Sequence, residues 1–140
     1  ELVRLGRRER MGAPDTFDFG GLLNLMTRLR SGEESIAIPL FDRSFEIARA
    51  GADIVSLRDR ILIVEGNYLL LDEDPWRSLA GWFDLTVSID VPLDELLRRL
   101  RRRWADHGKS PEAARHWIET NDLPNVRRVL DSSLPADVVV

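Results

Sequence analysis

The spacing of apolar side chains changes several times along the chain, and the helical stretches are the clearest. Between residues 19 and 31 apolar side chains recur every three or four positions, which predicts an amphipathic helix. Asp18 or Thr16 stands where a helix cap belongs, and Gly32 follows the last periodic position. The same spacing predicts a short helix over residues 76–82, and three later ones over 93–107, 111–120 and 123–132.

Strand-like segments lie between these predicted helices. Residues 36–41 and 53–57 read as edge or hairpin strands, broken by Pro39 and Gly51. Residues 60–66 place four consecutive apolar side chains before a carboxylate and a glycine, a pattern typical of a strand buried on both faces in a parallel sheet. Two more strands are predicted over 84–91 and 136–140. Because helices rather than tight turns separate most of these strands, we expect an α/β fold with parallel connections.

Composition narrows the class of protein. The chain has 140 residues, 44% hydrophobic and 31% charged, which suits one globular domain without a disordered tract. It contains no cysteine, which excludes disulfides and thiolate chemistry. Twenty basic residues against 24 acidic ones give a net charge of −4, which disfavours a general nucleic-acid binder. The apolar runs are too short to span a bilayer, so we expect a cytoplasmic protein with no membrane partner.

Two groups of side chains are candidates for chemistry. Glu65 ends the apolar run at 61–64, where a carboxylate in an α/β sheet can reach Mg²⁺ or a substrate hydroxyl; it can equally be a strand-terminal acid facing water. Five arginines between residues 98 and 103 suit an anionic ligand, or simply a solvated helix face. Asp15 and Asp42 lie in loops and could pair with arginines or bind substrate hydroxyls.

Several segments, taken together, resemble the uridine kinase and phosphoribulokinase-like group of P-loop kinases. They are residues 10–18, 39–43, 63–71, 83–85, 107–110 and 121–125. The resemblance extends over essentially all 140 residues, and it is closest to bacterial nucleoside or sugar kinase-like proteins labelled as fructose-transport-system kinases.

The resemblance implies ATP-dependent phosphoryl transfer to a hydroxyl of a small molecule, with ATP and Mg²⁺ as cofactors. Glu65 would match the catalytic acid near Mg²⁺, which it would contact indirectly. Asp15, Asp42, Arg43 and Tyr68 would bind the acceptor. A lid over about residues 93–122 would close on the phosphates through Arg98, Arg102 and Lys109, with Arg102 also catalytic. Such chemistry relies on positioning and on neutralising charge on the phosphate oxygens.

The sequence also departs from the family pattern. It contains no G-x-x-x-x-G-K-[ST] motif, and it lacks the family's second strand with the expected general-base aspartate. Met11 stands where these relatives commonly carry lysine. Since the chain also opens on Glu1 rather than methionine, we expect residues 1–140 to be one incomplete kinase domain whose P-loop NTPase-type parallel sheet, flanked by helices, lacks its N-terminal strand-loop-helix.

A sheet without its central strand would expose unpaired backbone groups and apolar faces. We therefore expect the 140-residue chain alone to be inactive and to aggregate or to form homodimers through exposed sheet edges. An alternative is a truncated or decayed kinase homologue that acts only by binding. A nucleic-acid or polyanion binder using residues 98–103 is a third reading. The acceptor stays open among nucleosides, fructose-like sugars and pantothenate-like alcohols.

Overall fold

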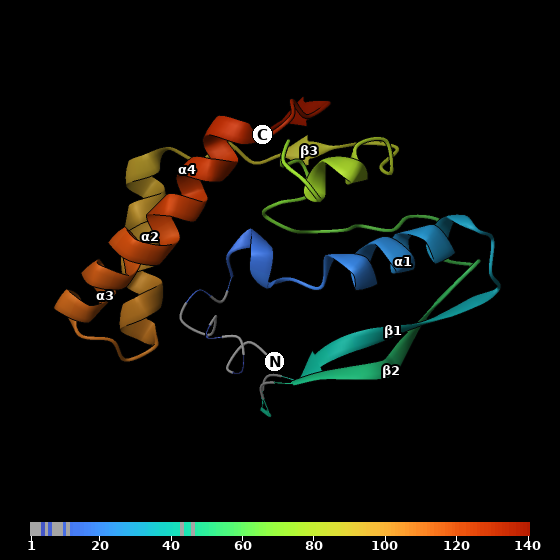
Figure 1. The fold of residues 1–140 in the computed structure, drawn as a ribbon, viewed down its shortest axis with the longest axis horizontal. Helices are drawn as coiled ribbons and strands as arrows, with labels where there is room; N and C mark the ends of the chain where they lie inside the picture. Colours follow the sequence, from blue (N-terminus) through green and yellow to red (C-terminus); the bar gives the residue numbers. More distant parts are fainter. Residues whose placement is uncertain (1–3, 5, 7–9, 11, 43, 46) are drawn as a thin grey trace. The chain divides into compact units, whose positions relative to one another are not determined.

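The computed structural model describes residues 4, 6, 10, 12–42, 44–45 and 47–140, and the chain divides into two compact units (Figure 1). One unit, called here the split unit, combines the described residues up to Phe17 with residues 67–140. The other, the hairpin unit, is the continuous stretch from Asp18 to Gly66. No helix within the described ranges is both long enough and apolar enough to cross a bilayer.

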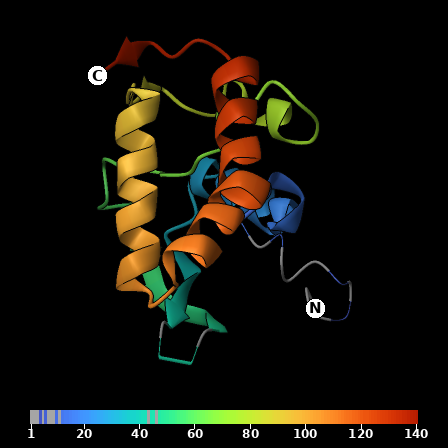
Figure 2. The same cartoon turned by 90° about the vertical axis from the view of Figure 1, so that its left-hand side faces the viewer.

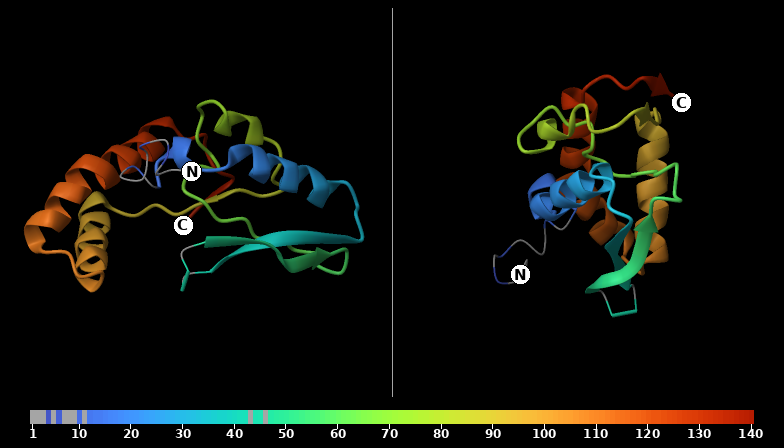
Figure 3. Two further views of the ribbon diagram at one scale, coloured as in Figure 1. Left: turned by 60° about the horizontal axis from the view of Figure 1, so that its bottom comes forward. Right: turned by 90° about the vertical axis from the view of Figure 1, so that its right-hand side faces the viewer.

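The hairpin unit contains one helix and one β-hairpin. Helix α1 covers Phe19–Arg30, and the Asp18 side chain caps it by accepting a hydrogen bond from the backbone N–H of Gly21 at 2.9 Å, which confirms both the helix and its cap. Strands β1 (Ser35–Asp42) and β2 (Ile47–Ser56) pair antiparallel (Figure 3). Among the described residues of this unit, the buried apolar ones are Met26 of α1 and Ile36 of β1.

The pairing of β1 with β2 continues on both sides of Pro39 and Gly51, the two residues expected to break the strands. The register shifts between Ile38 and Leu40, so Pro39, which has no N–H to donate, lies at a bulge in the ladder. On the other strand Gly51 has a φ of +62°, a backbone conformation that favours glycine. These two local features let one hairpin replace the two short pieces predicted from sequence.

The split unit contains the remaining helices. The 3₁₀ turns η2 (Pro14–Thr16) and η3 (Trp76–Leu79) precede helix α2 (Leu93–Asp106). Helix α3 (Pro111–Trp117) begins at Ser110, whose hydroxyl accepts from the backbone N–H of Ala113. It continues through a π-helical turn, η4 (Ile118–Asp122), into α4 (Leu123–Ser132). In Figure 2 α2 and α4 stand upright, and the turn from α2 into α3 lies near the lower end of α2.

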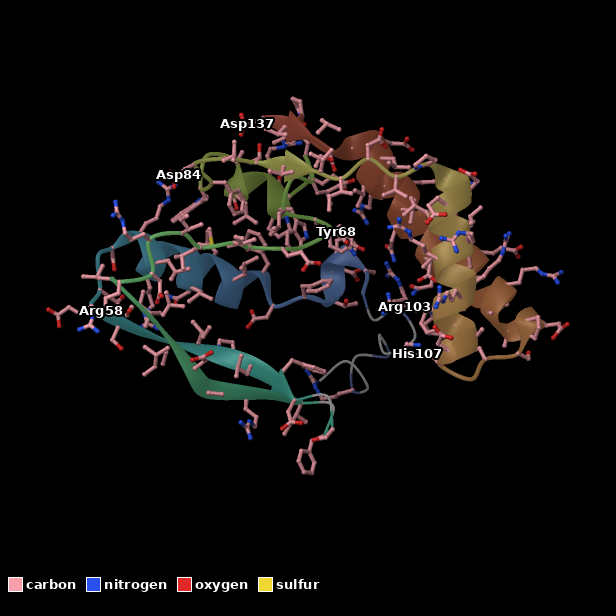
Figure 4. All side chains as sticks on the ribbon, turned by 180° about the vertical axis from the view of Figure 1, so that it is seen from behind. Arg58, Tyr68, Asp84, Arg103, His107 and Asp137 are labelled. Atoms are coloured by element: carbon pink, nitrogen blue, oxygen red, sulfur yellow. The ribbon has the colours of Figure 1, made fainter. Side chains whose placement is uncertain are left out.

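A short parallel pair closes the split unit. Strand β3 (Val87–Ser88) pairs in parallel with β4 (Val138–Val139), so the predicted parallel connection holds here, over fewer residues than the strands expected at 84–91 and 136–140. Asp137 and Thr86 fix the register: the Thr86 N–H and hydroxyl donate to the Asp137 carboxylate at 2.8 and 2.6 Å, and the Asp137 N–H donates back to the Thr86 hydroxyl oxygen. Asp137 is labelled in Figure 4.

The prediction of a buried strand over residues 60–66 is wrong. This segment pairs with no strand among the described residues, and the side chains of Ile61 and Ile63 are 83% and 90% exposed. The backbone of a strand forms its hydrogen bonds with a neighbouring strand. Without such a neighbour, an apolar segment lacks both these hydrogen bonds and a sheet in which its side chains could be buried. Leu85 and Ile89, beside β3, are also exposed.

Because large exposed apolar side chains favour association, we expect the 140-residue chain to self-associate as its concentration rises. Replacing Ile61 and Ile63 together by serine should shift sedimentation velocity profiles toward the monomer, because it removes apolar surface without changing the charge. Asn67→Ser, an exchange between two uncharged polar side chains at an exposed position just after this segment, is the matched control. A chain that stays monomeric at every concentration would contradict the expectation.

Candidate functional site

Three aromatic rings join the two stretches of sequence that form the split unit. Tyr68 and Trp76 are buried with ring centroids 5.5 Å apart, and Phe17 meets both rings edge-on at 5.8 and 5.9 Å. The Tyr68 hydroxyl donates a hydrogen bond of 2.7 Å to the carbonyl oxygen of Gly12. Offset and edge-to-face aromatic pairs stabilise beyond their buried area, so this cluster anchors the loop at residues 12–17.

The anchored loop carries Asp15 in the η2 turn. The Thr16 hydroxyl donates to the carbonyl of Ala13 at 2.7 Å and accepts from the N–H of Gly12, which stiffens the turn. Arg10 donates to the Asp15 carboxylate at 3.2 Å. Asp15 is therefore held by its own loop, with an arginine at its side.

A cavity of about 270 Å³ opens beside Asp15. Its charged lining residues are Arg10, Asp15, Glu73, Asp74 and Arg128, and its apolar wall comes from Pro14, Leu71, Pro75 and Trp76. Five of the nine lining residues are charged, so the cavity is more polar than a typical small-molecule site and suits a polar ligand. Carboxylates that accept and guanidinium groups that donate suit a ligand with several hydroxyl groups.

Arg128 and Glu73 form the firmest ion pair at this cavity. The Arg128 Nε lies 3.0 and 2.9 Å from the two Glu73 carboxylate oxygens, and its Nη2 also donates to Oε2. The Arg128 guanidinium lowers the pKa of Glu73, so this carboxyl stays charged at neutral pH. Burial raises the pKa of Tyr68, which keeps its hydroxyl protonated as a donor to Gly12.

The structure brings together only some of the residues selected from sequence. Asp15 and Tyr68 share the split unit, and Tyr68 supports the loop that carries Asp15. Asp42 and Glu65 belong to the hairpin unit, where Glu65 is exposed at the end of the unpaired apolar segment. Asp42 accepts from the Ser44 N–H and hydroxyl, which lower its pKa, and lies 3.8 Å from Arg49. Arg43 lies outside the described residues.

The arginines of α2 are not equivalent. Glu95 accepts from Arg98 through two nitrogens, at 2.6 and 2.7 Å, and from Arg99 at 2.7 Å. Arg102 is more than three-quarters exposed and lies 4.0 Å from Asp106. Lys109 places its ammonium group over the rings of Trp104 and Trp117, at 5.2 and 4.7 Å from their centroids. The contacts with Glu95 therefore hold Arg98 against α2, whereas the side chain of Arg102 stays largely exposed.

Reasoning from sequence missed Glu73, Trp76 and Arg128 as parts of the cavity. Glu73 and Arg128 are 55 positions apart, so no local spacing links them. Trp76 is buried in the core and lines the cavity as well. Arg10 lies in the segment that carries the resemblance, five residues before Asp15, and that spacing was the available signal.

The donor set gives little support for a resident metal. Within the described ranges, no three histidine or acidic side chains gather in a way that could hold a metal ion. Glu65 is a single carboxylate, whereas Mg²⁺ sites combine carboxylates with phosphate oxygens and water. The described residues alone therefore do not fit a metal site.

Comparisons with known proteins point to phosphoryl-transfer enzymes. The chain is 31% identical to the "ATP-dependent kinase-like protein notR'" of Aspergillus versicolor, over 94% of this chain and 80% of that one. It is 33% identical to "Uncharacterized protein YggC" of Escherichia coli, over 92% of this chain and 53% of that one. Further relatives are named uridine kinase and pantothenate kinase. No family model matches the chain.

A solved structure gives the same indication. The "putative fructose transport system kinase" of Silicibacter sp. TM1040 superposes with a TM-score of 0.91 at 42% identity, over 99% of this chain and 67% of that one. This match supports the α/β kinase fold predicted from sequence, whereas the described residues contain parallel pairing only in the two-stranded sheet of β3 and β4. This chain spans about half the length of several curated relatives.

The Glu95 cluster yields a prediction about pH. Its two arginines hold the pKa of Glu95 at about 2, below the ordinary 4.5, so the stabilisation from this cluster is present above pH 4.5 and is lost as the pH falls toward 2. Carboxyl NMR titration of the wild-type chain should show the low value. In Arg98→Ala/Arg99→Ala the pKa should return toward 4.5, while Arg101→Ala should leave it unchanged. An ordinary value in the wild type would contradict the geometry.

Proposed function

This chain belongs to the family of ATP-dependent P-loop kinases that includes relatives named uridine kinase and pantothenate kinase, and we propose that the whole protein transfers a phosphoryl group from ATP to a hydroxyl of a small molecule. The observation that carries the proposal is the cavity beside Asp15, in a chain with kinase relatives over nearly its full length. The proposal concerns the whole protein, because the chain spans about half of several relatives.

The cavity supports a role in holding the acceptor. Asp15 can accept a hydrogen bond from an acceptor hydroxyl, and Arg10 and Arg128 can donate to other oxygens of the same molecule. We propose that Asp15 orients the acceptor and that Tyr68 positions the loop beneath it, since the Tyr68 hydroxyl is bound to the Gly12 carbonyl. Orienting the attacking group is a large part of what a kinase contributes to its reaction.

The other family positions keep their proposed roles. Glu65 is the proposed catalytic carboxylate, Asp42 and Arg43 the proposed acceptor contacts from the hairpin unit, and Arg98, Arg102 and Lys109 the proposed cations for phosphate. The exposed side chain of Arg102 is available to an incoming phosphate, whereas Arg98 must first leave Glu95. The 140 residues contain no phosphate-loop motif, and none of them is assigned to that loop.

The acceptor is identified by measuring ADP release from the protein expressed from its complete reading frame, with nucleosides, fructose-like sugars and pantothenate as candidate acceptors. Turnover with one of these classes supports the proposal. Saturable binding of an acceptor with no ADP release would instead favour the alternative, a kinase homologue that acts by binding.

Asp15→Asn should raise the KM for that acceptor by about tenfold or more, because it weakens a charge-assisted hydrogen bond. The matched control is Asp131→Asn, which removes an exposed carboxylate of α4 that does not line the cavity. Equal KM values for the two variants would remove Asp15 from the acceptor site.

Glu65→Gln should lower kcat by roughly a hundredfold or more while leaving ATP affinity nearly unchanged, as expected for a carboxylate that acts on the reacting groups.

Arg102→Ala should lower the rate with little effect on the fold, because its side chain is largely exposed. Single-turnover kinetics and circular dichroism test the pair. If both variants kept the parental rate, the proposed site residues would be wrong.

A further inference from the structure

A second cavity lies in the groove where α2 turns into α3, within the split unit. Its volume is about 400 Å³, inside the range of about 300–1,000 Å³ typical of small-molecule sites. The lining residues are Arg101, Ala105, Lys109, Pro111, Ala114, Arg115 and Glu119, none of which lines the cavity beside Asp15.

The local sequence explains why a groove forms here. Helix α2 ends at Asp106, and Gly108, with a φ of +75°, reverses the chain before Ser110 caps α3. Alanine and proline side chains on the facing surfaces are too small to fill the angle between the helices. They leave an apolar floor made by Ala105, Pro111 and Ala114.

Lys109 is fixed at the edge of this floor. Its ammonium group lies over the rings of Trp104 and Trp117, and the Trp104 indole donates to Asp122 at 2.7 Å. These contacts restrict a side chain that would otherwise lose conformational freedom on binding a ligand. The positive charge at the groove is therefore held in place.

The charge of the groove is positive in a chain that is acidic overall. Three cations, Arg101, Lys109 and Arg115, face one carboxylate, Glu119, a net charge of +2 against −4 for the whole chain. As far as the structure describes the chain, neither Arg101 nor Arg115 forms an ion pair with a carboxylate. Arg98 and Arg99, by contrast, both form ion pairs with Glu95.

The arginines of α2 thus serve different sides of the helix. Arg101 and Ala105 are four positions apart, so they share the side of α2 that faces the groove. Arg103 and His107, labelled in Figure 4, each follow one of these residues by two positions and therefore lie on another side of the helix. Arg103 lies over the Trp104 ring, and His107 contacts the Arg103 carbonyl. The groove therefore uses a separate arginine rather than the whole basic cluster.

We propose that this groove binds an organic phosphate, with Arg101 and Arg115 as the principal donors to the phosphate oxygens. Guanidinium groups match phosphate oxygens in a two-pronged geometry, and the fixed Lys109 adds a third positive charge. The apolar floor and the volume favour a phosphate attached to an apolar group over a bare ion. The inference does not rest on the proposed kinase activity, because binding is measured without turnover.

The test uses isothermal titration calorimetry of the complete protein at constant ionic strength, with phenyl phosphate and inorganic phosphate as probes. We expect saturable binding of phenyl phosphate, tighter than that of inorganic phosphate. Arg101→Ala/Arg115→Ala should weaken phenyl phosphate binding by about tenfold or more, since two charge-assisted contacts are lost. No saturable binding, or equal binding of both probes, would overturn the proposal.

The matched control is Arg99→Ala/Arg127→Ala, which removes the same charge from the split unit at two exposed arginines. It should leave phenyl phosphate binding within about twofold, because neither arginine lines the groove. Equal losses in the two double variants would show attraction by net charge alone and overturn the site. Arg101→Lys/Arg115→Lys keeps the charge if the alanine variant does not fold. This lysine variant should bind phenyl phosphate more weakly than the wild type, because an ammonium group cannot donate two parallel hydrogen bonds as a guanidinium group does. Unchanged binding would contradict the proposed donors.

Discussion

The hydrogen bond from the Tyr68 hydroxyl to the Gly12 carbonyl, with the aromatic rings around it, is the contact on which the candidate site depends. The split unit is assembled from two stretches of chain between which the whole hairpin unit intervenes. Without an anchor, the loop at residues 12–17 would have no fixed place beside the segment at residues 71–76. Asp15 could then line no defined cavity, so a packing interaction sets the geometry of the polar site.

Sequence reasoning succeeded where structure is determined locally. Helix α1 follows from its apolar spacing and the Asp18 cap, and α3 follows from Ser110 and Pro111, because both signals act within one helical turn. The kinase resemblance was also readable, since several motifs occur in order along the chain. Asp15 could be selected from such a motif before its surroundings were known.

The failures concern contacts between distant residues. Residues 60–66 have the composition of a buried strand, but a strand also needs a neighbour, which composition cannot supply. The Glu73–Arg128 pair joins a loop to helix α4, and no spacing rule connects the two. The five arginines of α2 looked alike in the sequence, and their separation into paired and groove-facing side chains depends on Glu95 and on the turn into α3.

The split unit also has a consequence for the order in which the protein folds. Residues 18–66 form a continuous unit whose hairpin contacts are near in sequence, so they can form as soon as that stretch has left the ribosome. The loop carrying Asp15 is synthesised earlier but gains its partners Tyr68 and Trp76 only later. During synthesis the cavity beside Asp15 is therefore completed after the hairpin unit, although one of its walls is made first.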